Sequence, residues 1–212
     1  TAALRGAAAF DGATGRPLDV EDGAVPAPVE NPGRVPPAVA IEILEEPAPS
    51  GWFTTAPRVR LRGFDVDDPQ ADSGDRLRLE LRVSGGEWAA YSEPVRITDE
   101  GVHLIEARVT DRHGLTGVTS REISVDTAPP VSRATVKDLG ASVEITLHAE
   151  DDVSGVERIQ WEGPGTFWGT FQEAFVRAIG DEPQVIEFAA TDRAGNEEPR
   201  RRLVIPGGGA SR

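Results

Sequence analysis

Two stretches, IEARVTDRHG at residues 105–114 and IEFAATDRAG at residues 186–195, match at a constant spacing of 81 positions and share Ile, Glu, Thr, Asp, Arg and Gly. Ser73–Gly74 and Ser154–Gly155 keep the same spacing. Self-similarity at a fixed period indicates a duplicated structural unit. We therefore expect two copies of one domain, each of roughly 80–90 residues.

Short stretches in which apolar and polar residues alternate occur in both copies. They are VRLRG (59–63), RLRLELRV (76–83), REISV (121–125) and SVEITLHA (142–149). A period of two is typical of a strand with one face buried in an antiparallel sheet. About seven such strands per copy suit a two-layered sandwich. The predicted fold is all-β, with two tandem antiparallel β-sandwiches preceded by an extended N-terminal arm.

The prolines and the repeat together suggest five segments. Residues 1–37 contain six prolines and little periodic hydrophobicity, which predicts an extended arm, a linker or the end of an upstream domain. The first sandwich is expected over 38–126 and the second over 131–206. Between them, residues 127–130 form a proline-rich joint that we expect to be extended and stiff. Residues 207–212 are expected to be a flexible tail.

Several of these motifs resemble a known family of domains. The second copy contains AEDDVSGVERIQW (149–161), TFWGTFQEAF (166–175) and IEFAATDRAGNEEP (186–199), and the first copy closes with VDTAPP (125–130). They resemble the tandem DxSGV…TDxAGN repeats of bacterial immunoglobulin-like domains, over residues 38–206. The resemblance implies that both predicted sandwiches are immunoglobulin-like antiparallel β-sandwiches. The resemblance implies a secreted or cell-surface protein, because such domains serve there as spacers, adhesive modules or companions of catalytic domains. The first copy departs from the pattern, since Asp-Arg-His-Gly-Leu replaces Asp-x-Ala-Gly-Asn.

Composition excludes several classes of function. The 212 residues include 36 acidic and 22 basic side chains, for a net charge of −14, and no cysteine. The acidic balance disfavours nucleic acid as a partner, and the lack of cysteine excludes disulfides and thiolate metal sites. No run approaches the roughly 18 apolar residues of a membrane helix, so we expect no membrane insertion. Without an initiating Met, the chain is expected to be part of a larger protein whose neighbouring domains are its partners.

Clustered acidic residues in the predicted loops suggest calcium, which takes six to eight oxygen ligands. The candidate ligands are Asp67, Asp68 and Asp111 in the first copy and Asp151, Asp152 and Asp192 in the second. The alternative is local: an Asp side chain in TDRAGN accepts turn N–H groups, Gly195 supplies a positive φ, and surface charge maintains solubility. Apart from calcium, no cofactor is expected.

Aromatic residues suggest a second kind of site. Trp52, Phe53, Trp88 and Tyr91 are side chains of the type that stacks on sugar rings. Trp52 and Phe53 precede the first regular strand of the repeat, so they are expected to be the most exposed pair. The alternative is that large rings fill the cores of two small sandwiches, as we expect for Trp161 at the end of an alternating strand.

Catalytic patterns are weak in this sequence. The histidines at 103, 113 and 148 lack a metal-binding spacing, and no serine lies in GxSxG. The predicted function is therefore a non-catalytic extracellular module pair, acting as a spacer, interaction or adhesion segment of a larger bacterial surface or secreted protein. A polysaccharide or a surface protein is the expected external partner. The alternative is a carbohydrate-binding accessory module of a secreted glycoside hydrolase.

Overall fold

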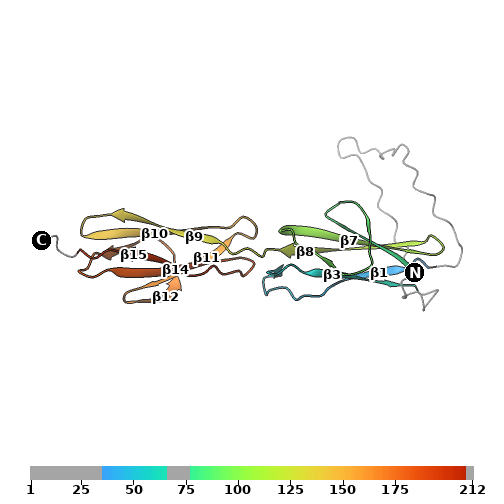
Figure 1. Ribbon diagram of the computed structural model, residues 1–212, viewed down its shortest axis with the longest axis horizontal. Coiled ribbons are helices and arrows are strands. Elements are labelled where there is room, and N and C mark those ends of the chain that lie inside the picture. The colour runs from blue at the N-terminus through green and yellow to red at the C-terminus, as the bar shows by residue number, and fades with distance from the viewer. Residues whose placement is uncertain (1–34, 66–76, 209–212) are drawn as a thin grey trace, which may run out of the picture. The chain divides into compact units, whose positions relative to one another are not determined.

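A computed structural model describes residues 35–65 and 77–208 (Figure 1). Residues 1–34 of the predicted arm (1–37) and residues 209–212 of the predicted tail (207–212) lie outside the described residues. The described residues contain fifteen strands and no helix, which confirms the all-β prediction. They are β1 (Ala38–Ile43), β2 (Trp52–Phe53), β3 (Arg58–Phe64), β4 (Leu77–Val83), β5 (Ala89–Ala90), β6 (Val95–Arg96), β7 (Gly101–Asp111), β8 (Thr116–Val125), β9 (Val131–Asp138), β10 (Ser142–Glu150), β11 (Val156–Gly163), β12 (Thr166–Thr170), β13 (Phe175–Ala178), β14 (Gln184–Asp192) and β15 (Arg201–Ile205). In this part of the chain there is no helix of the length and apolarity needed to cross a bilayer.

Strands β1 to β8 form the first sandwich. One sheet has the order β1-β3-β6 and the other the order β2-β8-β7-β4-β5. The alternating apolar residues of both sheets meet in one core, where Val59 from β3 packs with Ile105 from β7 and Val125 from β8. All three are fully buried, as the period-two pattern predicts.

One strand pair of the first sandwich is parallel, which the prediction of purely antiparallel sheets did not include. Strand β2 pairs with the end of β8, with Trp52 opposite Ser124 and Phe53 opposite Val125. The chain leaves β1, turns at Gly51 with φ of 87° and joins the opposite sheet. Because it crosses from one sheet to the other, the short strand runs alongside β8 in the same direction.

Strands β9 to β15 form the second sandwich, from sheets of order β13-β10-β9 and β12-β11-β14-β15. Its core joins Ile145 of β10 to Ile186 of β14. The ring of Trp161 on β11 stacks on Phe175 of the facing sheet at a centroid distance of 3.9 Å. The predicted inward position of Trp161 is thus confirmed, and the stacked pair links the two sheets in a chain without disulfides.

A buried carboxylate ties the start of the second sandwich to its central strand. Glu198 is 4% exposed and accepts the backbone N–H of Ser132 at 3.1 Å and that of Ala190 at 2.9 Å. It also pairs with Arg201 at 2.8 Å. Because a buried N–H left without a partner costs about 1–3 kcal/mol, this carboxylate helps to fix β9 beside β14.

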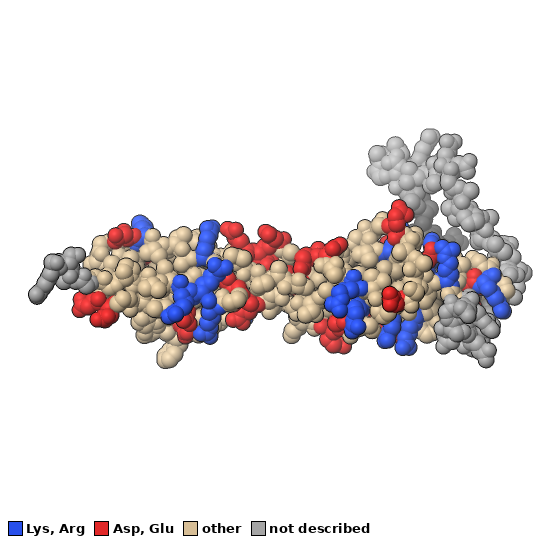
Figure 2. Space-filling view, viewed as in Figure 1, with Lys and Arg blue, Asp and Glu red and all other residues tan. Residues whose placement is uncertain are grey.

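On the face shown in Figure 2, acidic and basic side chains are interspersed on both sandwiches.

Candidate functional site at the joint

The segment between β8 and β9 is hydrogen-bonded to both sandwiches. On the side of the first, the Asp126 N–H donates to the carbonyl of Phe53 at 3.0 Å, and the Thr127 N–H and hydroxyl donate to the Glu100 carboxylate at 2.9 and 2.6 Å. On the side of the second, the Asn196 side chain donates to the carbonyls of Asp126 and Ala128 at 2.8 and 3.3 Å. These residues therefore belong structurally to both modules.

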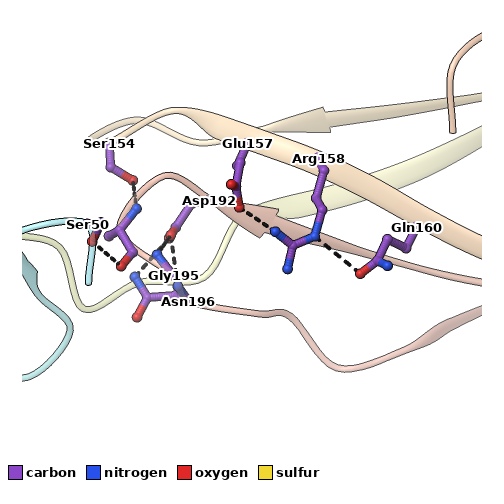
Figure 3. Close-up of polar contacts among 9 residues, drawn as sticks. Ser50, Ser154, Glu157, Arg158, Gln160, Asp192, Gly195 and Asn196 are labelled. Atoms are coloured by element: carbon purple, nitrogen blue, oxygen red, sulfur yellow. Dashed lines mark hydrogen bonds and ion pairs between the residues drawn. The ribbon is translucent and has the colours of Figure 1, made fainter. Parts of the chain in front are cut away.

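A further contact joins the sandwiches without the linker. The hydroxyl of Ser50, which precedes β2, donates to the carbonyl of Ala194 at 2.9 Å (Figure 3). The Ala194 N–H in turn donates to the hydroxyl of Ser154 at 3.2 Å. The loop after β10 and the hairpin after β14 are thus linked to each other and to the first sandwich.

Three aspartates converge at this joint. One carboxylate oxygen each of Asp126, Asp151 and Asp192 lies within 4.8 Å of the other two. Asp126 and Asp192 are fully buried, and Asp151 is half-buried. Asp126 comes from the linker, Asp151 from the loop after β10 and Asp192 from the end of β14, so folding gathers residues far apart in the sequence.

Backbone N–H groups surround these carboxylates. Asp126 accepts from Ser154 at 3.0 Å, and Asp151 accepts from Gly155 at 2.6 Å. Asp192 accepts from the Gly195 and Asn196 backbone at 2.6 and 2.8 Å, as in the predicted turn, where Gly195 has φ of 108° (Figure 3). The same corner recurs in the first copy.

Charge at the cluster is not balanced by basic side chains. Among residues 35–65 and 77–208, no lysine or arginine forms an ion pair with any of the three carboxylates. Burying ionised carboxylates side by side costs free energy, which hydrogen bonds from N–H groups offset in part and a bound cation would offset further. The cluster offers a cation carboxylate oxygens as ligand atoms. Oxygen ligands suit a hard cation such as calcium and do not suit zinc. Three carboxylates would supply part of its shell, and carbonyl oxygens or water the rest.

Of the four predicted calcium ligands that lie in the described residues, the structure brings together Asp151 and Asp192. Asp152 is exposed and outside the cluster. Asp111 lies at the corresponding corner of the first sandwich, where it accepts the N–H groups of His113 and Leu115 at 2.8 Å each. Asp67 and Asp68 lie outside the described residues.

The sequence analysis did not include Asp126 among the ligands. Its only sequence signal was its place as the first residue of the DTAPP joint, which we interpreted as a connection. Linker aspartates also occur without any partner carboxylate. Only the fold shows that the end of β8 reaches the loops of the second copy.

The four predicted carbohydrate-binding aromatics do not form one surface. Trp52 and Phe53 form β2, while Trp88 and Tyr91 flank β5, and β2 and β5 are the two edges of the same five-stranded sheet. Phe53 is only 4% exposed and belongs to the core, so the expectation of an exposed Trp52–Phe53 pair is wrong for Phe53.

The other three rings are half-buried. Tyr91 packs against the core of the first sandwich. Trp88 has the guanidinium groups of Arg82 and Arg108 against its ring, at 4.7 and 4.5 Å from the ring centroid. Carbohydrate binding at these residues stays a prediction.

No family model matches the chain, and no match was found among curated proteins. Solved structures show a general likeness. The fibronectin(III)-like modules of Clostridium thermocellum CbhA align at 13% identity and a TM-score of 0.35, over 79% of this chain and 94% of theirs. Dimeric latent PorU from Porphyromonas gingivalis aligns at 11% identity and a TM-score of 0.34, over 88% of this chain and 21% of PorU.

The FN1-FN3 domains of chicken CNTN1 align at 13% identity and a TM-score of 0.26, over 82% of this chain and 66% of theirs. At these identities and TM-scores the likeness carries no argument about function. The sandwich architecture rests on the strand pairing and shared cores described above.

Proposed function

We propose that this chain is a non-catalytic pair of immunoglobulin-like modules that acts as a spacer or adhesion segment within a larger secreted or cell-surface protein. The observation that carries the proposal is the fastening of residues 126–128 to both sandwiches. A spacer holds a neighbouring domain at a defined position only if its own modules move together. A linker that is hydrogen-bonded to both sandwiches restricts their motion relative to each other.

The hydrogen bonds at the joint differ from those of an ordinary flexible linker. Asp126 is fully buried and Pro130 is less than 2% exposed, so the segment is packed as well as hydrogen-bonded. Ser50 and Ala194 add a direct bond between the modules. Each bond contributes about 1 kcal/mol, and several acting together keep the joint mostly closed.

Rotational diffusion tests this proposal. We expect ¹⁵N relaxation to give one common correlation time for the two sandwiches. A matched variant with a flexible Gly-Ser segment inserted after Ala128 should give two shorter and different times, because the modules then tumble separately. If the unmodified chain and the insertion variant tumble alike, the spacer proposal is wrong.

A second candidate function is a cation-locked joint, and the specific observation favouring it is the Asp126–Asp151–Asp192 cluster, with which no basic side chain among the described residues forms an ion pair. Calcium at these oxygens would join the linker to two loops of the second sandwich. Bound only in the folded state, it would stabilise the joint by mass action. The spacer proposal does not require it, because the hydrogen bonds from Asn196 and Ser154 are already formed.

A further inference from the structure

A row of charged side chains crosses the outer face of the four-stranded sheet in the second sandwich. Glu162 on β11 lies directly opposite Glu187 on β14, and Glu187 lies opposite Arg202 on β15. Their chain neighbours Trp161 and Ile186 face the core, so the three charges face outward. Like charges directly opposite in a sheet are destabilising, so the Glu162–Glu187 pair calls for a reason.

Two arginines hold the carboxylates in place. An Arg200 nitrogen lies 3.2 Å from Glu162 and 3.6 Å from Glu187, and Arg202 lies 3.3 Å from Glu187. All four side chains are at least 31% exposed, and ion pairs at such sites stabilise by only about 0–1 kcal/mol. The arrangement is therefore poorly explained by stability, and violations of local sheet rules are expected at functional sites.

An aromatic ring completes the row. The guanidinium of Arg200 lies over the half-buried ring of Trp168 on β12, at 4.2 Å from its centroid. Thr166, which lines a hollow beside this row, lies on the same strand. The ring thus flanks the carboxylates and the arginines, and acidic and basic side chains gather on the visible face of this sandwich in Figure 2.

The sheet is hollowed beside this row. An open depression of about 420 Å³ is lined by Glu162, Glu187, Arg202 and Thr166, with Gln184 at its side. The pairing of β11 with β12 shifts register here, because the three steps from Thr166 to Gly169 oppose the two from Trp161 to Gly163, and this bulge bends β12.

A Cβ at position 163 would lie 2.5 Å from Cδ1 of Ile186, so a larger residue than glycine there would force the buried Ile186 side chain to move. Arg177 holds the turn between β11 and β12, which borders the hollow, because it donates to the carbonyl of Pro164 and to the hydroxyl of Thr166. The hollow is therefore built into the fold.

We propose that this hollow binds a sugar residue of a neutral polysaccharide through hydrogen bonds from its polar side chains, with the stacked Arg200 and Trp168 side chains at its edge. Carboxylates, a guanidinium, a hydroxyl and an amide together donate to and accept from the paired hydroxyls of a sugar. A neutral ligand leaves the Arg200 and Arg202 ion pairs intact. An anion would be repelled by Glu162 and Glu187, and a cation by the two arginines. The site goes beyond the spacer function and does not depend on the joint.

Titration of the ¹⁵N-labelled chain with cellohexaose, xylohexaose and chitohexaose tests the proposal. We expect a saturable shift of the Trp168 indole N–H, together with the Thr166 and Glu187 amides, for at least one of the three at millimolar concentration. If none of them shifts these signals, or if only an acidic glycan such as polygalacturonate does, the proposal is wrong.

Variants identify the residues responsible. Trp168→Ala and Glu162→Gln should each weaken the affinity about ten-fold or more, with far-UV spectra unchanged. The matched control is Phe167→Ala, which removes a 94% exposed ring of the same strand that does not line the hollow and should leave the affinity unchanged. Loss of binding in Phe167→Ala and not in Trp168→Ala would overturn the assignment. Neither result bears on how the two sandwiches tumble.

Discussion

Nδ2 of Asn196 lies 2.8 Å from the backbone carbonyl oxygen of Asp126, so a hairpin corner of the second sandwich holds the residue that ends the first. The same amide nitrogen lies 2.8 Å from Oδ2 of Asp192. One side chain thus connects the linker to the corner of its own repeat. The first copy has Leu115 at the matching position and lacks this connection.

Replacing Asn196 should loosen the joint. Asn196→Ala removes the donors to Asp126, Ala128 and Asp192, so we expect the second sandwich to lose about 1–2 kcal/mol of unfolding free energy and amide exchange to accelerate at residues 127–128. Hydrogen exchange and chemical denaturation measure both effects. Thr116→Ala, an exposed change in the corresponding hairpin of the first sandwich, is the control. Equal exchange in the two variants would show that Asn196 does not hold the linker.

Calcium should raise the melting temperature of the second sandwich if the aspartate cluster binds it. Asp151→Asn removes one of the three charges and should abolish most of that increase. Asp152→Asn is the matched control, because Asp152 is the adjacent, exposed residue outside the cluster. Scanning calorimetry with calcium and with a chelator gives the comparison. If calcium leaves the melting temperature of the unmodified chain unchanged, the cluster does not bind it. The proposal of a hydrogen-bonded joint would still stand.

Acid should destabilise the first sandwich through Glu80. The hydrogen bond from Arg108 at 2.8 Å, assisted by Arg78, lowers the pKa of this buried carboxyl below its ordinary value, against the opposing effect of burial. A lowered folded-state pKa contributes stability that is complete above the unfolded pKa and is lost as pH falls through the folded one.

We therefore expect Glu80→Gln to be less stable than the unmodified chain at neutral pH and to lose less stability below pH of about 4. Denaturant unfolding of both proteins across this range is the measurement. Parallel pH profiles for the two proteins would contradict the assigned role of Glu80.

Removing the stacked ring of Trp161 should destabilise the second sandwich alone. Trp161→Ala deletes the contact with Phe175 and opens the core, at a cost of about 3 kcal/mol. Phe167→Ala on the neighbouring strand is the control, because Phe167 is 94% exposed and its loss should change little. Calorimetry that shows equal effects for the two variants would mean that the stacked pair does not link the sheets.

The repeat and the period-two pattern predicted two similar domains and the strands β3, β4, β10 and the end of β8. Apolar residues such as Ile105 and Ile186 recur at one spacing, and both are fully buried in their respective cores. The parallel strand β2 was not predictable, because two residues are too few to show a period. The burial of Phe53 was not predictable either, because it depends on pairing with Val125, which is far away in the sequence.

The sites were less predictable than the fold. The turn chemistry at Asp192 and Gly195 follows from local residue types and was expected. Asp126 joins the cluster only because the linker packs against loops of the second copy. The hollow beside Glu162 depends on the register shift at Gly163, which no local pattern reveals.

The most direct test of the account is the ¹⁵N order parameters of the backbone amides of Thr127 and Ala128. Both residues are exposed, yet their amides donate to Glu100 and Asp126, and the carbonyl of Ala128 accepts from Asn196. A joint fastened to both sandwiches predicts values of about 0.85, as in rigid strands. Values below about 0.6, typical of a flexible linker, would contradict it.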